Sequence, residues 1–211
     1  MTFVRIPTKA PKRVGAGNFV PEEMESTHGV LLHGLKNGDS DAALAFCDTY
    51  GPRINRWVWR LLGGDNDHDE VVQQVYVGLF SALPKLRDVS ALDAFVDSVT
   101  IRTVRKEIRR RKYKRLFFCP TTVVEEDLIS DNNRPLKDAH VRAFYRALDK
   151  LNTEERLIFV LKHFEGLTMA EIAKLSGLSV RTAKRRLYSG TARLRDLMMK
   201  ETVLVTMLEE Y

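Results

Sequence analysis

The chain has 211 residues, of which 44% are hydrophobic and 29% are charged, and its formal net charge is +6 at pH 7. This composition is typical of a globular protein of one or two small domains. It excludes a membrane protein, because no apolar run approaches the roughly 18 residues that a spanning helix needs, and the N-terminus lacks the apolar core of a secretory signal.

Residues 1–27 are the first predicted segment, a flexible N-terminal tail. This stretch has three prolines, two glycines and few large apolar side chains. From about Val30 the apolar residues recur at helical spacing as far as residue 118, so we expect a helical domain over residues 28–118.

Four helices are expected in this first domain. The first breaks near Gly51-Pro52, because proline cannot donate a backbone hydrogen bond. The second ends at Gly63-Gly64 and places Trp57 in the core and Trp59 outside it. The third ends before Pro84, and the fourth begins near Leu92 and runs into a basic segment.

That basic segment, residues 102–116, holds nine basic residues and one acid. Because these basic residues are distributed around the whole helix, only some of them can face any one ligand. The spacing of three and four residues favours one stripe as the DNA-facing side, made of Arg102, Arg105, Lys106 and Arg109. The alternative is a solvated helix end.

Residues 119–138 change character and predict a flexible linker. Two prolines flank an acidic patch that includes Glu125, Glu126 and Asp127. Beyond it, apolar spacing predicts a second, four-helix domain over residues 139–200, followed by a C-terminal tail over residues 201–211. Asn152 or Thr153 caps the second of its helices. The fold class is therefore all-α, with two small helical domains joined by an acidic linker.

The last two helices of the second domain have the pattern of a helix-turn-helix. Thr168 and Glu171 have the spacing of a capping box. Gly177 stands where the chain must turn and a left-handed backbone favours glycine. Ser179 is a good cap for the final helix. The absent side chain of Gly190 allows close helix packing.

The final helix is strongly basic, since residues 179–200 hold seven basic residues and one acid. The two basic segments together carry a net +14, so the rest of the chain carries −8. The predicted apolar stripe of this helix consists of Ala183, Leu187, Gly190, Leu194 and Leu197. Arg181, Lys184, Arg185 and Tyr188 lie on other faces, where a major groove would accept them. Arg186 fits a phosphate contact or a surface ion pair. The alternative is an ordinary helical hairpin with a solvated basic face.

Two stretches of the chain resemble bacterial RNA polymerase sigma factors of the extracytoplasmic-function group. Region 4 of that family is resembled by residues 151–187, LNTEERLIFVLKHFEGLTMAEIAKLSGLSVRTAKRRL. Region 2 is resembled by residues 70–76, EVVQQVY. The resemblance covers roughly residues 38–200. Glu70 stands where the family has aspartate, Gln74 where it has glutamate, and Phe95 where it has tryptophan.

The resemblance implies a transcription initiation factor that is not an enzyme and has no cofactor. Its partners would be core RNA polymerase, through the β′ clamp helices and the β flap, promoter DNA, and an anti-sigma factor, all in the cytoplasm. Polymerase binding would fall to Glu70, Gln73, Gln74 and Tyr76. Minus-10 recognition would fall to Phe95, Arg102, Arg105, Lys106 and Arg109. Minus-35 recognition would fall to Ser179, Arg181, Thr182, Lys184, Arg185, Arg186 and Tyr188. The acidic linker would thread near the active-site channel.

Two other readings use the same helix-turn-helix. A response-regulator transcription factor would carry a phosphoacceptor α/β domain ahead of it, and this pattern shows helices there instead. A recombinase-like DNA-processing enzyme would need a nucleophile with supporting arginines or clustered carboxylates, and we find neither. Cys47, Cys119 and the five histidines match no metal-binding pattern, so no catalytic or metal site is expected.

Overall fold

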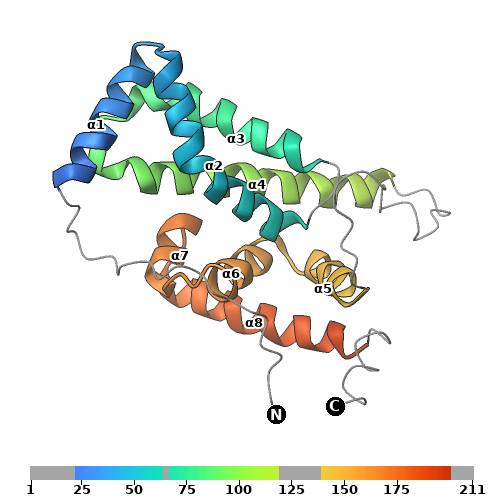
Figure 1. The fold of residues 1–211 in the computed structure, drawn as a ribbon. Coiled ribbons are helices and arrows are strands. Elements are labelled where there is room, and N and C mark those ends of the chain that lie inside the picture. Colours follow the sequence, from blue (N-terminus) through green and yellow to red (C-terminus); the bar gives the residue numbers. More distant parts are fainter. Residues whose placement is uncertain (1–21, 64–66, 119–138, 201–211) are drawn as a thin grey trace.

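The computed structural model describes residues 22–63, 67–118 and 139–200. Every regular element in these ranges is a helix, as the all-α prediction requires. The helices form two tiers, α1–α4 above and α5–α8 below (Figure 1). The tail over residues 1–21, the linker at 119–138 with its acidic patch, and the tail at 201–211 lie outside the described residues.

The first tier consists of four helices and two short 3₁₀ turns. Its core is built from side chains that are almost fully buried, among them Phe46, Trp57, Val75, Leu79 and Ile108. The elements are α1 (Glu22–Lys36), α2 (Ser40–Leu62), α3 (His68–Ala82), η1 (Leu83–Lys85), η2 (Val89–Ala91) and α4 (Leu92–Phe118). Helix α1 therefore begins within the segment that the sequence assigns to the tail.

The predicted break near Gly51-Pro52 is wrong, because α2 continues through both residues from Ser40 to Leu62. Pro52 forfeits one backbone hydrogen bond, but Tyr50 and Ile54 on either side of it are 2% and 1% exposed. Burial of this face outweighs the local cost of the proline. Gly51 is needed there, since a Cβ at this position would lie 2.9 Å from the Tyr76 hydroxyl.

The second tier is the predicted four-helix domain. Asn152 is the cap of its second helix and forms a capping box with Glu155. The last helix buries Ala183, Gly190 and Leu194, and a Cβ at Gly190 would lie 3.0 Å from Glu155 Cβ. The absence of a side chain at Gly190 therefore lets this helix approach its neighbour, as predicted. The elements are α5 (Ala139–Lys150), α6 (Thr153–His163), α7 (Met169–Ser176) and α8 (Val180–Met198).

The two tiers touch along one side of each. Helices α2 and α4 of the first tier pack against α6, and α4 also packs against α7. Helix α8 lies at the far edge of the second tier (Figure 1). Among the described residues, no helix is long and apolar enough to cross a membrane.

Candidate nucleic-acid interface

The turn between α7 and α8 has the geometry that its sequence predicts. Glu171 Oε2 accepts hydrogen bonds from the backbone N–H and the hydroxyl of Thr168, both at 2.8 Å. Gly177 adopts a left-handed backbone, φ 66° and ψ 32°, and the Leu178 N–H donates to the Ala173 carbonyl at 2.9 Å. The Ser179 hydroxyl accepts from the Thr182 N–H at 3.1 Å. These bonds fix the angle at which α8 leaves α7.

The outer face of α8 presents cations and one aromatic ring to solvent. Arg181, Lys184 and Arg185 are exposed, and Tyr188 is 76% exposed. The Thr182 and Ser179 hydroxyls are 2.8 Å apart, which ties Thr182 to the helix start. Ser179 is exposed, whereas Arg186 and Thr182 are half-buried. An exposed basic face of this size can enter a major groove without rearrangement of the helix.

The basic side chains in the C-terminal half of α4 are of two kinds. Some form ion pairs with acidic residues, and others are exposed to solvent. Glu107 is 2% exposed and accepts from Arg110 at 2.7 Å and from Arg111 at 2.7 Å. Burial alone would raise the pKa of Glu107, but these two hydrogen bonds and charges outweigh it and hold the pKa below its usual value. Asp67, before α3, lies 3.8 Å from Arg110. These arginines therefore brace the first tier.

The predicted DNA-facing stripe of α4 is not uniform. Arg102 and Lys106 are exposed. Arg105 is only 19% exposed, and its Nη2 donates to the Ser176 carbonyl at 3.1 Å. Arg109 is 58% exposed and donates to Glu154 at 3.2 Å. Phe95, at the other end of α4, is half-buried and packs against the core.

The predicted polymerase-binding residues lie on α3. Glu70, Gln73 and Gln74 are exposed, and Gln74 donates to Glu70 at 3.0 Å. Tyr76 is half-buried and stacks on Phe80, with ring centroids 6.2 Å apart and an interplanar angle of 18°. Tyr76 thus belongs partly to the packing of α3 on α2.

The same face of α3 carries two apolar residues that the sequence reasoning missed. Val77 is 66% exposed and Phe80 is 38% exposed. Val77 follows Gln73 by four residues, and Phe80 follows Gln73 by seven, so both continue the row begun by Glu70. Apolar residues spaced four and seven positions after the polar Gln73, on a helix face predicted to be exposed, are the sequence signal that would have identified Val77 and Phe80.

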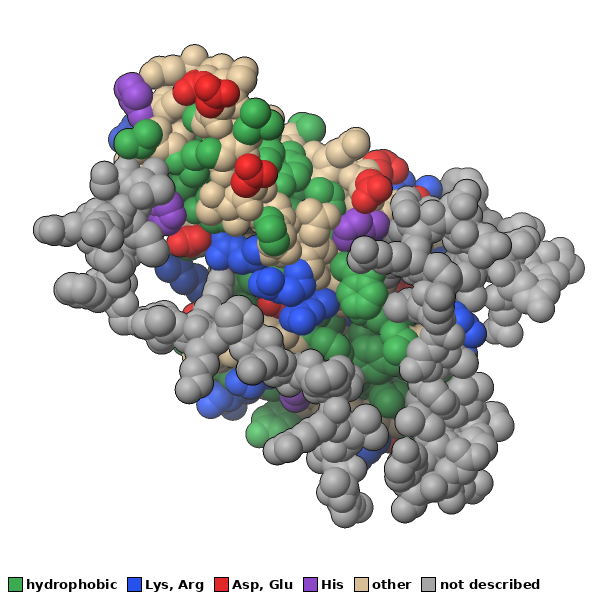
Figure 2. Space-filling model, in the orientation of Figure 1, with side chains coloured by type: hydrophobic (Ala, Val, Ile, Leu, Met, Phe, Trp, Pro, Cys, Tyr) green, Lys and Arg blue, Asp and Glu red, His purple; other side chains and the backbone are tan. Residues whose placement is uncertain are grey.

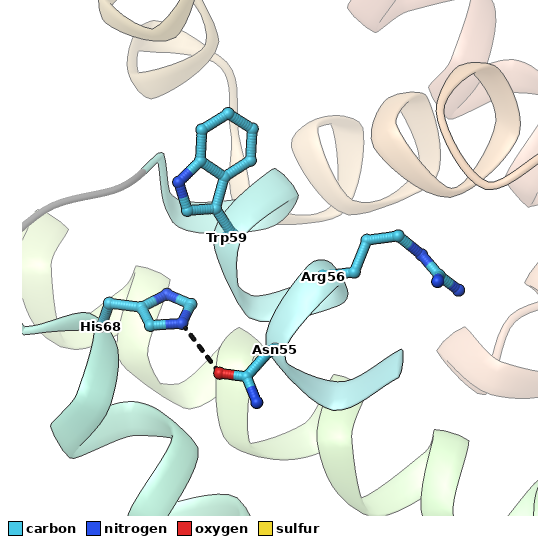
Figure 3. A pocket seen from close by; sticks show the side chains of 4 residues that line it. All are labelled: Asn55, Arg56, Trp59 and His68. Carbon is cyan, nitrogen blue, oxygen red and sulfur yellow. Dashed lines mark hydrogen bonds between the residues drawn. The ribbon is translucent and has the colours of Figure 1, made fainter. Parts of the chain in front are cut away.

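A pocket of about 300 Å³ lies beside the junction of the two tiers and is lined by Asn55, Arg56, Trp59 and His68 (Figure 3). His68 Nε2 and Asn55 Oδ1 are 3.2 Å apart. Trp59 is 37% exposed and Trp57 is 2% exposed, as the sequence predicts for this pair. The Trp59 ring and the Tyr145 ring on α5 form an edge-to-face pair, with centroids 5.9 Å apart. Within the described ranges, no three His, Cys, Asp or Glu side chains group as metal ligands.

Two family models match the chain in succession. The model described as Sigma-70 region 2 matches residues 46–113, and the model described as Sigma-70, region 4 matches residues 142–194. The first match spans most of α2 and all of α3, and it reaches into the basic part of α4. The second spans almost all of α5–α8. A response-regulator factor or a recombinase would not account for the region 2 match.

Curated relatives give the same result. The chain is 25% identical over 164 residues to the extracytoplasmic-function (ECF) RNA polymerase sigma factor SigE of Mycolicibacterium smegmatis, covering 72% of this chain and 60% of that protein. It is 24% identical over 168 residues to the RNA polymerase sigma factor SigV of Bacillus subtilis, covering 79% of this chain and 97% of that protein.

Two solved structures share the fold. One is CnrH in complex with the cytosolic domain of CnrY, with a TM-score of 0.57 and 21% identity over 82% of this chain and 97% of that one. The other is the sigma factor RpoE in complex with the anti-sigma factor NepR from Bartonella quintana, with a TM-score of 0.53 and 16% identity over 74% of this chain and 96% of that one.

Proposed function

Because this chain belongs to the extracytoplasmic-function group of sigma-70 RNA polymerase sigma factors, we propose that it binds core RNA polymerase and directs transcription from promoters with its own minus-10 and minus-35 sequences. The observation that carries this proposal is the order of the two family matches, region 2 followed by region 4, on one chain. Polymerase makes the phosphodiester bonds, and this protein supplies specificity rather than catalysis. It acts where polymerase and chromosome meet, in the cytoplasm.

Each unit has a separate task. The first tier, residues 22–118, binds the β′ clamp helices through the exposed row of α3, made of Glu70, Gln73 and Gln74, and through the adjoining, half-buried Tyr76. The second tier, residues 139–200, binds the β flap and the minus-35 element. Two separate contacts on one chain set the spacing at which a promoter can be read.

The minus-35 element is read by α8. Its exposed cations meet phosphates and guanine edges in the major groove, and the backbone N–H groups at its start favour a phosphate. Base contacts come from the N-terminal half, through Arg181, Lys184, Arg185 and Tyr188. Ser179 and Thr182 hold the start of the helix, and Arg186 reaches the backbone of the DNA.

The minus-10 element is opened and held by α4. Arg102, Arg105, Lys106 and Arg109 form a basic stripe that follows a single strand, and Phe95 lies at the end of α4 nearest η2. Proteins that bind single strands combine such a stripe with aromatic faces or base pockets. An inhibitory protein of the anti-sigma type is a further partner.

The direct test combines the purified chain with sigma-free core polymerase and sequences the transcripts made from genomic DNA. We expect complex formation and a set of transcripts that start at a shared promoter sequence. If no complex forms and no added transcripts appear, the chain is not a sigma factor.

Replacing Arg181 by alanine should relax base preference at one position of the minus-35 element. An arginine that forks onto guanine contributes roughly 1–3 kcal/mol of discrimination. The measurement is the affinity of the holoenzyme for promoters that differ at each position. Arg195 is also exposed on α8, about 21 Å along the helix from Arg181, so Arg195→Ala is the matched control. An equal loss on all sequences would make Arg181 a phosphate contact.

A further inference from the structure

The first residue of α8 is an exposed aliphatic side chain. Val180 is 41% exposed and directly follows Ser179, the residue that caps the helix. The nearby aliphatic residues are less exposed, since Ala183 is buried, and Leu178 and Leu187 are half-buried and pack against the core. Val180 differs from them in being open to a ligand.

The surroundings of Val180 are cationic. Helical spacing makes Val180 the first member of a row that continues through Lys184 and Tyr188, each four residues further on, with Arg181 and Arg185 beside this row. All four of these residues are exposed. Figure 2 shows Lys and Arg side chains on the lower tier near the end of α8 that adjoins α7. Val180 therefore borders the face of α8 that is proposed to enter the major groove.

The position of Val180 along α8 favours contact with bases over contact with phosphates. A recognition helix lies in the major groove with its N-terminal residues against the base edges, and α8 begins at Val180. The start of the helix is fixed by the left-handed backbone of Gly177 and by the Ser179 hydroxyl, which accepts from the Thr182 N–H at 3.1 Å. The side chain is thus positioned before DNA binds.

An aliphatic side chain matches one chemical group in the major groove. The base edges there present hydrogen-bond donors, hydrogen-bond acceptors and a single apolar group, the C5 methyl of thymine. Contact between the Val180 Cγ methyl groups and the thymine methyl removes apolar surface from water, which is favourable. Contact with a polar base edge would instead remove water from a donor or acceptor without replacing its hydrogen bond, which is unfavourable. The chemistry of the side chain therefore selects thymine.

We propose that Val180 recognises a thymine of the minus-35 element through the C5 methyl group of that base. The proposal rests on the proposed assignment of α8 to the minus-35 element, and it adds a specificity-determining residue to the cations and the tyrosine of that helix. The neighbouring cations supply affinity through phosphates and guanine edges, and Val180 supplies a preference for thymine at one position. Because 5-methylcytosine carries its methyl group on the same ring atom, Val180 also distinguishes 5-methylcytosine from cytosine there.

The test measures how a single methyl group affects binding of the holoenzyme to promoter DNA. The probe is a duplex with the strongest promoter from the transcript experiment, in which each thymine of the minus-35 element, on either strand, is replaced in turn by deoxyuridine. Deoxyuridine lacks only the C5 methyl group, so we expect an affinity loss of about fourfold at one position, as for one buried CH₂ group. Val180→Ala removes both Cγ methyl groups, keeps a good helix former at the start of α8, and should abolish this loss.

Val30→Ala is the matched control, because Val30 is a valine on α1 that is 74% exposed. It should show the same fourfold loss as the wild type. A second pair of probes carries cytosine or 5-methylcytosine at the sensitive position, which separates the methyl contact from any effect of deoxyuridine on the duplex. The wild type should prefer 5-methylcytosine, and Val180→Ala should bind the two probes equally.

Three results would overturn the role of Val180. They are equal wild-type affinity for thymine and deoxyuridine at every position, an undiminished loss in Val180→Ala, and equal wild-type affinity for cytosine and 5-methylcytosine. A chain that forms no holoenzyme, or a holoenzyme that binds no promoter, counts against the proposed function instead. A holoenzyme that binds its promoter without regard to any thymine methyl group counts against Val180 alone, so the two failures are distinguishable.

Discussion

Replacing Val77 by aspartate should weaken binding to core RNA polymerase by roughly 100-fold, about 3 kcal/mol, and leave the free protein folded. Val77 is 66% exposed in the free chain, so its replacement touches little of the core. In the proposed complex it lies with Gln73 and Gln74 against the clamp helices, where an unpaired carboxylate would lose its water. The measurement is the affinity of labelled protein for core polymerase.

Val30 provides the control for this experiment. It is a valine on a helix of the same tier and is 74% exposed, so Val30→Asp makes the same chemical change outside the proposed interface. Thermal unfolding of both variants should resemble that of wild type. If Val77→Asp binds core polymerase with wild-type affinity, α3 is not the docking face. If Val30→Asp loses as much affinity as Val77→Asp, the effect is a general effect of the added charge.

Local features of this fold were predictable from the sequence because they depend on neighbouring residues. The Thr168–Glu171 capping box, the left-handed Gly177 and the Ser179 cap each need only a few residues of context. The sequence left Asn152 and Thr153 open as the cap of α6. The structure selects Asn152, whose side chain accepts from the Glu155 N–H at 2.8 Å.

The continuity of α2 was not predictable from local rules. Glycine at position 51 followed by proline at position 52 is a strong break signal. The helix survives because Phe46, Tyr50, Ile54 and Trp57 share one buried face with the rest of the tier. A rule that considers only neighbours along the chain cannot take account of burial against other helices.

The pairing of basic and acidic residues was also beyond the sequence. Spacing alone placed Arg105 and Arg109 on one stripe with Arg102. It did not indicate that Glu154, some 45 residues further along, would lie against two of them. Charge patterns give the number of cations on a helix face, but the packing of a second unit decides which of them remain available.

Replacing Glu155 by alanine should lower the free energy of unfolding of the second tier by about 3 kcal/mol. Glu155 is 1% exposed, and its carboxylate accepts from Ser189 at 2.7 Å and from Arg193 at 3.2 Å on α8. It also accepts from the Asn152 N–H at the start of α6. The loss combines a helix cap, about 1 kcal/mol, with hydrogen bonds to an ionised group, roughly 1.5–3 kcal/mol in all. Urea unfolding followed by circular dichroism measures it.

Two other variants separate this role from a general effect of charge. Glu155→Gln keeps the shape of the side chain and can still accept from Asn152 and Ser189, so it should lose about half as much stability. Glu154→Gln changes the preceding residue, whose partners lie on α4 rather than α8, and should cost less than about 1 kcal/mol. If Glu155→Ala costs no more than Glu154→Gln, then α8 is held by its apolar stripe of Ala183, Leu187 and Leu194 alone. The angle of the proposed recognition helix would then depend on packing and not on this buried carboxylate.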